Sequence, residues 1–521
     1  MNFEKQVNYY RRGGKMAIKI LSSTYSGIEG MIITVEVEIS RGLPAFNIVG
    51  LADTAVRESK ERVRSAIINS GFDFPMGKIT VNLAPADIKK VGSLLDLPIA
   101  IGILAATEQI NYENIDEYIF AGELSLNGDI TKIKGALPII IEGLNNDINK
   151  FIVPKANADE CALLHKAQVF PFDTLNQVAL YLKNRDMFPY KSNSTIKKME
   201  YNYDFSEVIG QRAVKRALEI ACAGGHNIII LGPPGCGKSM LASRIPTILP
   251  DLTYEESLEI TKIYSIAGKL SSDQGLISTR PFRSPHHSSS KAALIGGGIQ
   301  LAPGEITLSH HGVLFLDELL EFDKNVLEVL REPLENKIIT LSRNSGTVVY
   351  PANFMLIGSS NPCPCGYYLS RVKECSCSDH ERRKYLSKLS GPFLDRIDLF
   401  TFAYQHQYKE IISTSKEESS RTIKSRVEAA RAIQKSRFKN QEIQCNAAMK
   451  NSHIAEYCKL DNESEKILQR FFYKFPFSLR AYNKILKISR TIADLEGSEN
   501  IRSPHIMEAF SYRQIEEDKV I

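Results

Sequence analysis

The chain has 521 residues, and its 65 Lys and Arg residues against 60 Asp and Glu residues give a formal net charge of +5. Hydrophobic residues make up 43% and charged residues 24%, ordinary values for a protein that buries a core, which excludes a wholly disordered chain. No apolar run reaches the ~18 residues that a membrane span requires, and residues 1–15 lack the apolar stretch of a secretory signal. Nine Cys residues in so long a chain argue against a disulfide scaffold, so we expect a cytoplasmic protein with no membrane partner.

The alternation of apolar and polar residues predicts three structured regions. An α/β pattern precedes a polar, mostly basic linker, and a second α/β pattern and a helical region follow it. The expected parts are a flexible extension at 1–15, an N-terminal α/β domain at 16–182, a linker at 183–203, an α/β core at 204–402 and a helical domain at 403–521.

The N-terminal domain combines strand-like and helix-like patterns. Residues 32–39 alternate between apolar and polar side chains, as a half-buried strand requires. Residues 53–70 place apolar side chains at helical spacing behind Asp53, the expected N-cap, and residues 97–106 are typical of a buried helix. Shorter strands are expected at 79–83 and 151–153.

A nucleotide site is indicated by residues 227–239. A short apolar strand at 227–231 leads into the sequence GPPGCGKS and then into a helical stretch at 240–249. This is the motif G-x-x-x-x-G-K-S in its strand–loop–helix context, in which backbone N–H groups surround phosphate oxygens. We expect Lys238 to reach the β- and γ-phosphates and the Ser239 hydroxyl to bind Mg²⁺. The expected ATP-binding residues are Gly232, Pro233, Pro234, Gly235, Cys236, Gly237, Lys238 and Ser239.

A second strand supports the nucleotide site. Residues 313–316 are apolar, and Asp317 and Glu318 follow them, at the end of the strand where parallel α/β sheets present their ligands. Asp317 is expected to hold Mg²⁺ through water and Glu318 to polarise the attacking water. The alternative, a strand that ends in a solvated acidic pair, is disfavoured by the neighbouring P-loop motif.

A third strand, at 353–358, ends near Asn361, whose side chain would position the attacking water. Ser359 and Ser360 are weaker candidates for that position. The three elements together resemble the core of AAA+ ATPases, and the segment DFSEVIGQ at 204–211 resembles the start of such domains. The resemblance implies ATP and Mg²⁺ as cofactors.

Two arginines are assigned by resemblance. The segment SGPFLDRIDL at 390–399 is similar to one in magnesium chelatases and archaeal-type replicative helicases, whose Arg reaches the neighbouring subunit's ATP site. Arg396 is therefore implied to be an arginine finger acting in trans, and the alternative is an ion pair with Asp395 or Asp398. Arg480, near the start of an expected helix, resembles the sensor-2 Arg of the AAA+ lid, and the alternative is an ordinary exposed helix Arg.

Two hairpins resemble insertions of the same group of ring ATPases, in which they line the central pore. Residues 299–308 are expected to turn at Pro303 and Gly304, and residues 338–350 at 344–346. The alternative is a pair of surface hairpins with no function.

Longer segments are similar to the ComM/YifB family of magnesium-chelatase-like AAA+ proteins. The resemblance runs from about residue 16 to residue 509. It implies a homo-hexameric ATPase that acts as a DNA helicase and promotes branch migration during natural transformation. The similar segments are 50–67, 68–75, 79–104, 122–130, 282–298 (FRSPHHSSSKAALIGGG), 361–368 (NPCPCGYY) and 489–501.

By the same resemblance, the N-terminal domain has the fold of Lon-type proteases, of the ribosomal S5 domain 2 type, which use a Ser–Lys dyad. The segment at 90–96 lacks their G-P-S-A-G nucleophile turn, and Ser93 is the only hydroxyl nearby. Leu137 stands at about the place where the Lys is expected. We interpret the domain as protease-dead, a module for binding or ring assembly, with peptidase activity as the runner-up.

Four cysteines form a C-x-C…C-x-C cluster in the loop at 361–380. Four thiolates on one short loop suit tetrahedral Zn²⁺, and His380 is a possible substitute ligand. The alternative is a set of unligated surface thiols. The expected zinc ligands are Cys363, Cys365, Cys375 and Cys377.

Three basic segments are candidate DNA contacts, and the linker at 183–203, with its five basic residues, is the weakest of them. In the first, basic side chains are interleaved with Ser residues that suit phosphate oxygens, and the alternative is helix capping and contact between subunits. In the second, residues 421–439, a helix has a positive face, for which a solvated surface is the commoner interpretation. Any DNA partner, single-stranded or branched, would be bound through its backbone regardless of base sequence. The candidates in the first segment are Arg280, Arg283, His286, His287 and Lys291.

Two other functions remain open. One is a chelatase-like motor subunit that acts on a tetrapyrrole enzyme, although the Lon-like domain and the cysteine cluster are not chelatase features. The other is an ATPase that remodels or degrades a protein client.

Overall fold

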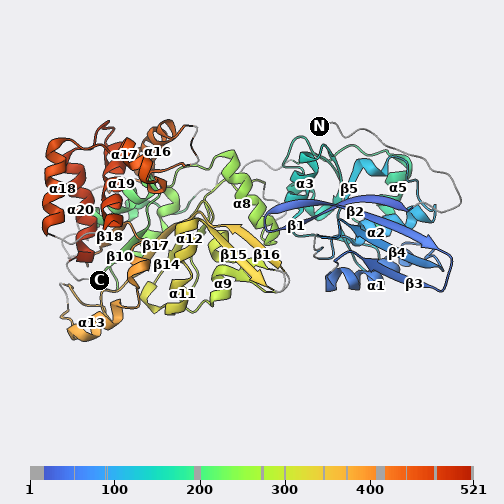
Figure 1. Cartoon of the computed structure of the whole chain (residues 1–521), viewed down its shortest axis with the longest axis horizontal. Coiled ribbons are helices and arrows are strands. Elements are labelled where there is room, and N and C mark those ends of the chain that lie inside the picture. The colour runs from blue at the N-terminus through green and yellow to red at the C-terminus, as the bar shows by residue number, and fades with distance from the viewer. Residues whose placement is uncertain are drawn as a thin grey trace. The chain divides into compact units, whose positions relative to one another are not determined.

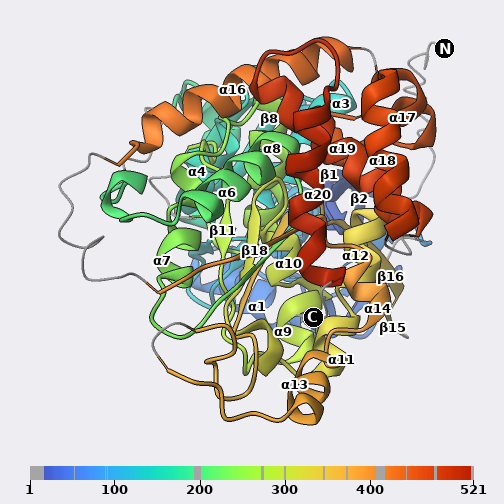
Figure 2. The same cartoon turned by 90° about the vertical axis from the view of Figure 1, so that its left-hand side faces the viewer.

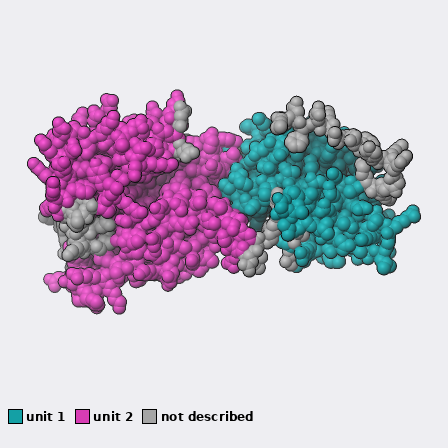
Figure 3. Space-filling view, in the orientation of Figure 1, with its two compact units in different colours: residues 1–197, 261–277 teal, residues 198–260, 278–521 magenta. Residues whose placement is uncertain are grey.

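The computed structural model describes most of the chain, which forms two compact units (Figure 3). Unit 1 comprises residues 1–197 and 261–277, and unit 2 comprises residues 198–260 and 278–521. Among the residues described, no helix combines the length and the apolar character that a membrane span needs. The described residues are 17–51, 53–87, 90, 92–192, 201–270, 275–298, 301–343, 346–370, 373–405, 417–439, 441, 443–474 and 478–517.

Unit 1 is built on a seven-stranded mixed sheet (Figure 1). Its strands are, in spatial order, β3 (Ala45–Val49), β4 (Lys78–Ala84), β2 (Glu29–Ser40), β1 (Ile18–Ser26), β5 (Tyr118–Phe120), β8 (Lys150–Pro154) and β9 (Gln168–Phe172). β2 is antiparallel to β1 and β4, and the other neighbours are parallel. Ile33, Val35 and Val37 on β2 are fully buried and alternate with more exposed residues, which confirms the strand expected at 32–39.

Helices pack against this sheet and extend its core. They include α1 (Thr54–Asn69), α2 (Asp96–Ala106), α3 (Ala136–Asn145), α4 (Ala158–Cys161) and α5 (Leu175–Asn184), with 3₁₀ turns at Ile115–Glu117 and Lys155–Asn157 and a small ladder of β6 (Glu123–Leu124) and β7 (Ile130–Thr131). The Asp53 carboxylate caps α1 by accepting a hydrogen bond from the Val56 N–H at 2.8 Å, as expected. α2 is apolar and almost wholly buried, which confirms the helix expected at 97–106.

Unit 1 extends beyond the boundaries expected from the sequence. α5 continues past residue 182, and the N–H of Tyr190 then donates to a β9 carbonyl at 2.7 Å. Residues 261–277, which the sequence assigned to the ATPase core, also group with unit 1. They include the second half of α8 (Tyr254–Ile266), where the Ser265 hydroxyl donates to the Glu160 carboxylate.

Unit 2 contains a five-stranded parallel sheet. Its strands are, in spatial order, β11 (Phe282–Arg283), β14 (Val313–Leu316), β17 (Met355–Ser360), β10 (Ile228–Leu231) and β18 (Leu399–Phe402). All neighbouring strands are parallel. Every residue of β10, β14, β17 and β18 is buried, as expected for a parallel sheet covered on both faces. The three strands predicted at the nucleotide site are therefore present, and the α/β fold class is confirmed.

Helices precede and connect these strands. They include α6 (Arg212–Gly224), α7 (Lys238–Ser243), α9 (Lys291–Ile295), α10 (Glu305–Leu308), α11 (Lys324–Glu328), α12 (Arg331–Asn336), α13 (Asp379–Leu386) and α14 (Gly391–Leu394), with 3₁₀ turns at Phe205–Glu207, Ile245–Thr247 and Leu319–Glu321. The helix expected at 240–249 is shorter, because α7 ends at Ser243 and a 3₁₀ turn follows. Pro246 lies in that turn and lacks the N–H that would continue an α-helix.

One of the two expected hairpins is confirmed, and the other needs correction. β15 (Ile338–Arg343) and β16 (Gly346–Pro351) pair antiparallel, as predicted for 338–350. In the other segment, β12 (Gly296–Gly297) pairs with β13 (Ala302–Pro303), so Pro303 lies in a strand and Gly304 is the N-cap of α10. Gly304 is needed for close packing rather than for a turn, since a Cβ atom there would lie 2.3 Å from the Gly296 nitrogen.

The C-terminal part of unit 2 is helical, as the sequence predicts. It includes α16 (Ser420–Arg437), a 3₁₀ turn at Asn446–Ala448, α17 (Asn451–Tyr457), α18 (Asn462–Lys474), α19 (Leu479–Leu495) and α20 (Ser503–Glu517). These helices gather in one group in both views of Figures 1 and 2. Ile423 and Val427 on α16 and Ile485 on α19 share one buried core with Leu218 on α6, so the helical group packs on the α/β part of the unit.

Candidate nucleotide site

The P-loop connects β10 to α7. Gly235 and Gly237 have φ values of 76° and 85°, a left-handed conformation that residues other than Gly rarely adopt. A Cβ atom on Gly232 would lie 2.4 Å from the carbonyl oxygen of Ala403. Backbone conformation therefore requires glycine at two positions of the motif, and a close approach of the chain requires it at a third.

The Lys238 ammonium group is held within the loop. Its Nζ donates to the carbonyl oxygens of Gly232 at 2.7 Å and Pro233 at 3.0 Å, and to Asn361 Oδ1 at 3.2 Å. Burial lowers the pKa of Lys238, and anionic groups nearby oppose that shift. The contact with Asn361 brings together the P-loop and the strand end that the sequence placed in one site.

Asp317 joins the P-loop from the neighbouring strand end. Its Oδ2 accepts a 2.6 Å hydrogen bond from Ser239 Oγ, and its Oδ1 accepts from the Ser359 hydroxyl and, at 3.1 Å, from the Glu318 N–H. Two oxygen ligands of the kind that Mg²⁺ prefers thus lie side by side and fit that ion. Ser359, which the sequence offered as a weaker candidate for positioning water, contacts Asp317 instead.

Glu318 contacts a residue that sequence reasoning assigned elsewhere. Glu318 has a φ of 51°, and its Oε2 lies 3.2 Å from Nδ1 of His287. His287 was expected among the DNA contacts. No local signal links the two residues, since they come from different strand ends.

A cavity of about 760 Å³ opens beside this pair. Both acidic and basic side chains line it, together with the Ser hydroxyls that follow His287. Lys291, another expected DNA contact, belongs to this lining. The lining residues are 287–291, 321–326 and Lys388.

The four cysteines of the loop at 361–380 lie together. Their sulfur atoms are all within 4.8 Å of one another. Cys363 Sγ lies 3.4 Å from Cys365 Sγ and 3.7 Å from Cys375 Sγ, and the N–H of Cys365 donates to Cys377 Sγ. Ligands at ~2.3 Å in a tetrahedral zinc site are roughly 3.8 Å apart. The four thiols therefore fit Zn²⁺, whereas His380 is not part of the cluster.

The cysteine loop contacts the P-loop. A Cβ atom on Gly366, whose φ is 83°, would lie 2.9 Å from Pro234 Cδ. Gln405 Nε2 donates to the Pro234 carbonyl at 3.3 Å, and Gln405 Oε1 accepts from Ser370 Oγ at 2.8 Å. The segment that holds the four thiols is thus packed on the wall of the nucleotide site.

Within the part of the chain that the structure describes, Arg396 and Arg480 contact residues outside this site. Arg396 pairs with Glu335 and donates from Nε to the Arg331 carbonyl at 3.1 Å. Arg480 Nη1 lies 3.4 Å from Asp395 Oδ2, and its Nη2 lies 3.9 Å from Glu335 Oε1. The two guanidinium groups therefore converge on Glu335, and the alternative partners Asp395 and Asp398 do not bind Arg396.

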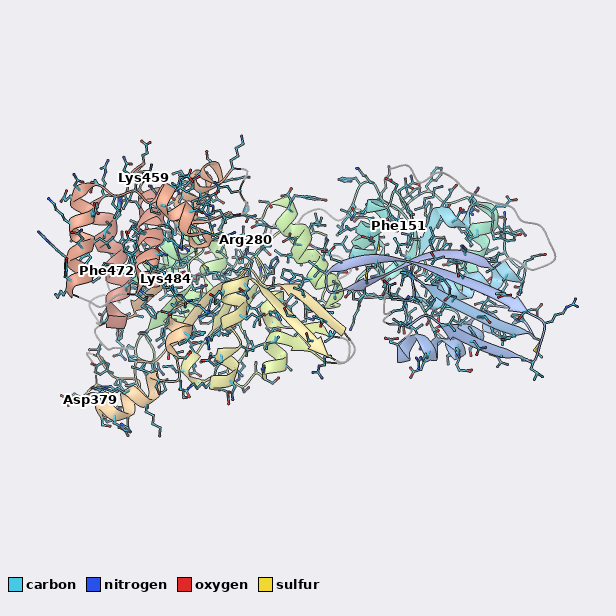
Figure 4. The ribbon with its side chains drawn as sticks, in the orientation of Figure 1. Phe151, Arg280, Asp379, Lys459, Phe472 and Lys484 are labelled. Atoms are coloured by element: carbon cyan, nitrogen blue, oxygen red, sulfur yellow. The ribbon has the colours of Figure 1, made fainter. Side chains whose placement is uncertain are left out.

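Two of the expected DNA contacts are engaged inside unit 2. Arg280, labelled in Figure 4, pairs with Glu256 at 2.8 Å and donates to the His311 carbonyl at 2.8 Å. Arg283 forms a bidentate pair with Glu305 at 2.6 and 2.8 Å. These two guanidinium groups are therefore not presented to a phosphate backbone, whereas His286 and Lys291 lie at the surface.

The basic helix is also partly internal. Arg426 on α16 pairs with Glu219 and with Glu418, and Arg437 pairs with Asp494. Arg431 donates to a carbonyl of α6 at 3.0 Å. Arg426 and Arg431 thus hold the helical group onto α6, and Arg437 pairs within the helical group. Neither of the two sequence interpretations had included these internal contacts.

A second group of metal-binding residue types comprises Glu259, His310 and His311. His310 Nδ1 accepts from the Asn353 N–H at 3.0 Å, so the neutral ring carries its proton on Nε2, which lies 3.1 Å from Glu259. A metal ion at Nε2 would need that nitrogen without its proton. Hydrogen bonds from both imidazoles hold the pKa of Glu259 well below its usual range. The three residues therefore fit a hydrogen-bonded cluster better than a metal site.

Comparison with known proteins relates both units to one family. Three family models match the chain: subunit ChlI of Mg-chelatase at residues 35–157, magnesium chelatase subunit ChlI at 204–411, and the C-terminal part of that subunit at 417–513. The chain is 44% identical over 492 residues to uncharacterized protein YifB of Escherichia coli (strain K12), covering 94% of this chain and 96% of that protein.

Two further relatives complete the comparison. Competence protein ComM of Haemophilus influenzae is 40% identical over 506 residues, which cover 96% of this chain and 98% of that protein. The magnesium-chelatase subunit ChlI of Bigelowiella natans is 26% identical over 190 residues, 32% of this chain and 52% of that protein. The similarity to the first two relatives thus spans both units.

Proposed function

The chain belongs to the ComM/YifB family of magnesium-chelatase-like AAA+ ATPases, and we propose that it is a DNA motor whose ATP hydrolysis drives branch migration in DNA recombination. The name of one relative, competence protein ComM, is the link to natural transformation. ATP hydrolysis, assembly into a ring and DNA binding would each depend on different residues.

The ATPase part is carried by the convergence of Lys238, Ser239, Asp317 and Asn361 at one edge of the parallel sheet. In the proposed site, Lys238 binds the β- and γ-phosphates, while Ser239 and Asp317 hold Mg²⁺, which neutralises charge on the phosphate oxygens. Glu318 accepts the proton of the attacking water. Asn361 orients that water through its amide.

The assembly part proposes a homo-hexamer with an ATP site at each subunit interface. Among the described residues, no hydrogen bond or ion pair joins Arg396 or Arg480 to the P-loop of the same chain. Both guanidinium groups lie at Glu335 instead, which supports an action in trans. Arg396 would reach the γ-phosphate bound by a neighbouring copy, where positive charge stabilises the transition state. Arg480 would act at the same interface.

We further propose that the four cysteines bind a structural Zn²⁺. The ion would close the loop that follows Asn361, and Gly366 of this loop packs on Pro234 of the P-loop. Since structural zinc contributes folding free energy, the ion would hold this wall of the site in place. The function proposed for the metal is therefore positional and not catalytic.

The DNA part rests on the hairpin of β15 and β16. Ile339 and Leu341 are buried on one side, while Ser342 and Arg343 near the hairpin tip are exposed. Exposed hydroxyl and guanidinium groups of this kind can contact phosphate oxygens without reading bases. His286 and Lys291 are the further phosphate contacts that remain exposed. Contacts of this kind predict binding that weakens with salt.

For the N-terminal unit we propose binding or ring assembly without proteolysis. The Ser93 hydroxyl donates to the Glu123 carboxylate, and Leu137 is fully buried. A Ser–Lys dyad needs a lysine amine as the base at the hydroxyl. The carboxylate partner of Ser93 therefore supports a domain without peptidase activity.

The deciding experiment is the steady-state ATPase rate of the full chain without DNA and with linear duplex, single strand or four-way junction. Lys238→Ala serves as the blank. We expect DNA to stimulate hydrolysis, most strongly as a junction, and labelled junctions to be resolved only with hydrolysable ATP. Hydrolysis that no DNA changes would contradict the DNA motor while leaving the ATPase intact, and would favour a protein client.

A further inference from the structure

Glu318, the proposed base, touches one imidazole of unit 2. Nδ1 of His287 lies 3.2 Å from Glu318 Oε2, and the two side chains are 36% and 56% exposed. A carboxylate that is half in solvent has many orientations, and a single directed contact reduces them. The contact therefore restricts the orientation of the Glu318 carboxylate, the group that is proposed to accept the proton from water.

The backbone and the ring packing hold both partners in place. Glu318 has a φ of 51°, sparsely populated by non-glycine residues, at the point where β14 passes into a 3₁₀ turn. The His287 ring packs at 4.1 Å from the His286 ring and at 6.5 Å, edge to face, from Phe322. His286 has a different partner, because its Nδ1 lies 2.8 Å from Ser288 Oγ. Only one of the two adjacent imidazoles thus contacts the proposed base.

We infer that His287 is a positioning residue for Glu318, an inference that rests on the proposed ATPase. With its proton on Nδ1, the ring donates to Oε2 and leaves Oε1 to accept a proton from water. In the step, the water oxygen bonds to the γ-phosphorus, the bond from that phosphorus to the β,γ-bridging oxygen breaks, and a water proton passes to Oε1. The products are ADP and phosphate.

The identity of the contacting nitrogen provides a sharp test. The side-chain amide of Asn can place its N–H near the position of His Nδ1, whereas Gln reaches toward the position of Nε2. His287→Asn should therefore retain most of the wild-type kcat. His287→Ala and His287→Gln should lower kcat about tenfold or more, because misplacing a catalytic group by ~1 Å can cost up to 100-fold. The KM for ATP should change little in all three variants.

Several measurements separate positioning from a structural effect. The half-exposed side chain lines a cavity, so its truncation should leave the thermal midpoint near that of the wild type. His165→Ala, which removes an exposed imidazole of unit 1, is the matched control with unchanged kcat. In a double-mutant cycle, His287→Ala should have no further effect on kcat once Glu318→Gln has removed the carboxylate.

The possible outcomes are distinct. Wild-type kcat in His287→Ala, together with inactive Lys238→Ala and a lowered but measurable kcat in Glu318→Gln, would overturn the inference and leave the ATPase intact. A rise in kcat would also overturn it, since the contact would then hold the carboxylate away from water. Equal losses in the Asn, Gln and Ala variants would show that Nδ1 is not the acting atom. Full activity of Lys238→Ala would refute the ATPase itself.

Discussion

The hydroxyl of Ser239 donates a 2.6 Å hydrogen bond to Oδ2 of Asp317, across 78 positions of sequence. The bond joins the first turn of α7 to the end of β14, where the parallel sheet brings the P-loop and the acidic strand end together. Both oxygens are hard ligands suited to Mg²⁺. This pair is therefore the part of the site on which hydrolysis should depend most directly.

The first prediction concerns metal use. Ser239→Ala removes one of the two adjacent oxygens, and we expect kcat to fall about tenfold or more and the Mg²⁺ concentration at half-maximal rate to rise. The measurement is the ATPase rate over a Mg²⁺ titration. Ser243→Ala is the matched control, because that hydroxyl donates to the Met240 carbonyl at 2.9 Å and accepts from Arg244 Nη1 at 3.2 Å, and neither partner belongs to the proposed site. An unchanged Mg²⁺ requirement in Ser239→Ala would contradict the proposed ligand pair.

The second prediction concerns the neighbouring subunit. Arg396→Ala and Lys238→Ala should each be inactive alone, because one lacks the finger and the other lacks the P-loop cation. In mixed rings, an intact P-loop should meet an intact Arg396 at about a quarter of the interfaces, so mixing should restore part of the ATPase rate. Rates that stay at the blank after subunit exchange, verified by labelled subunits, would argue against action in trans.

The third prediction concerns the cysteine cluster. The purified protein should contain about one Zn²⁺ per chain, and Cys377→Ser should lower both the zinc content and the thermal midpoint of unit 2. ATP affinity should also weaken, since Gly366 of this loop packs on Pro234. Elemental analysis and differential scanning calorimetry provide the measurement. Cys445→Ser is the control: this cysteine lies outside the cluster, so the variant should contain as much zinc as the wild type. A wild-type protein that is as stable without zinc as with it would disprove the site.

The fourth prediction concerns stability at mildly acidic pH. His226 is fully buried, and burial lowers its pKa from 6.5, while Asp398 opposes that shift. As pH falls through 6.5, the unfolded chain takes up a proton that the folded protein excludes. The contribution of the neutral ring to stability is therefore fully present above pH 6.5 and is lost progressively as the pH falls below that value.

The measurement is the free energy of unfolding between pH 7.5 and 5.5 for the wild type and His226→Gln. The variant should lose less stability over this range. Part of the pH dependence of the free energy of unfolding should remain, because burial also lowers the pKa of His310. Equal slopes in both proteins would mean that His226 titrates normally in the folded state.

Much of the nucleotide site is determined by the sequence itself. Three short local patterns make up this part of the site: the P-loop, the strand with Asp317 and Glu318, and the strand before Asn361. Each requires the same backbone conformation in any parallel α/β sheet. Alternation along β2 and the N-cap at Asp53 are local in the same sense. Such features could be predicted because each depends on residues that are near one another in the chain.

Tertiary structure alone decided the partners of the charged side chains. His287 contacts Glu318, Arg280 pairs with Glu256, and Arg396 pairs with Glu335, and each of these acids is far away in the sequence. A charge in a sequence does not reveal which opposite charge will lie within a few ångströms, because that distance depends on how strands and helices pack. The same reason explains Gly304, whose sequence pattern indicates a turn, whereas the close approach of Gly296 is what requires a residue without a side chain.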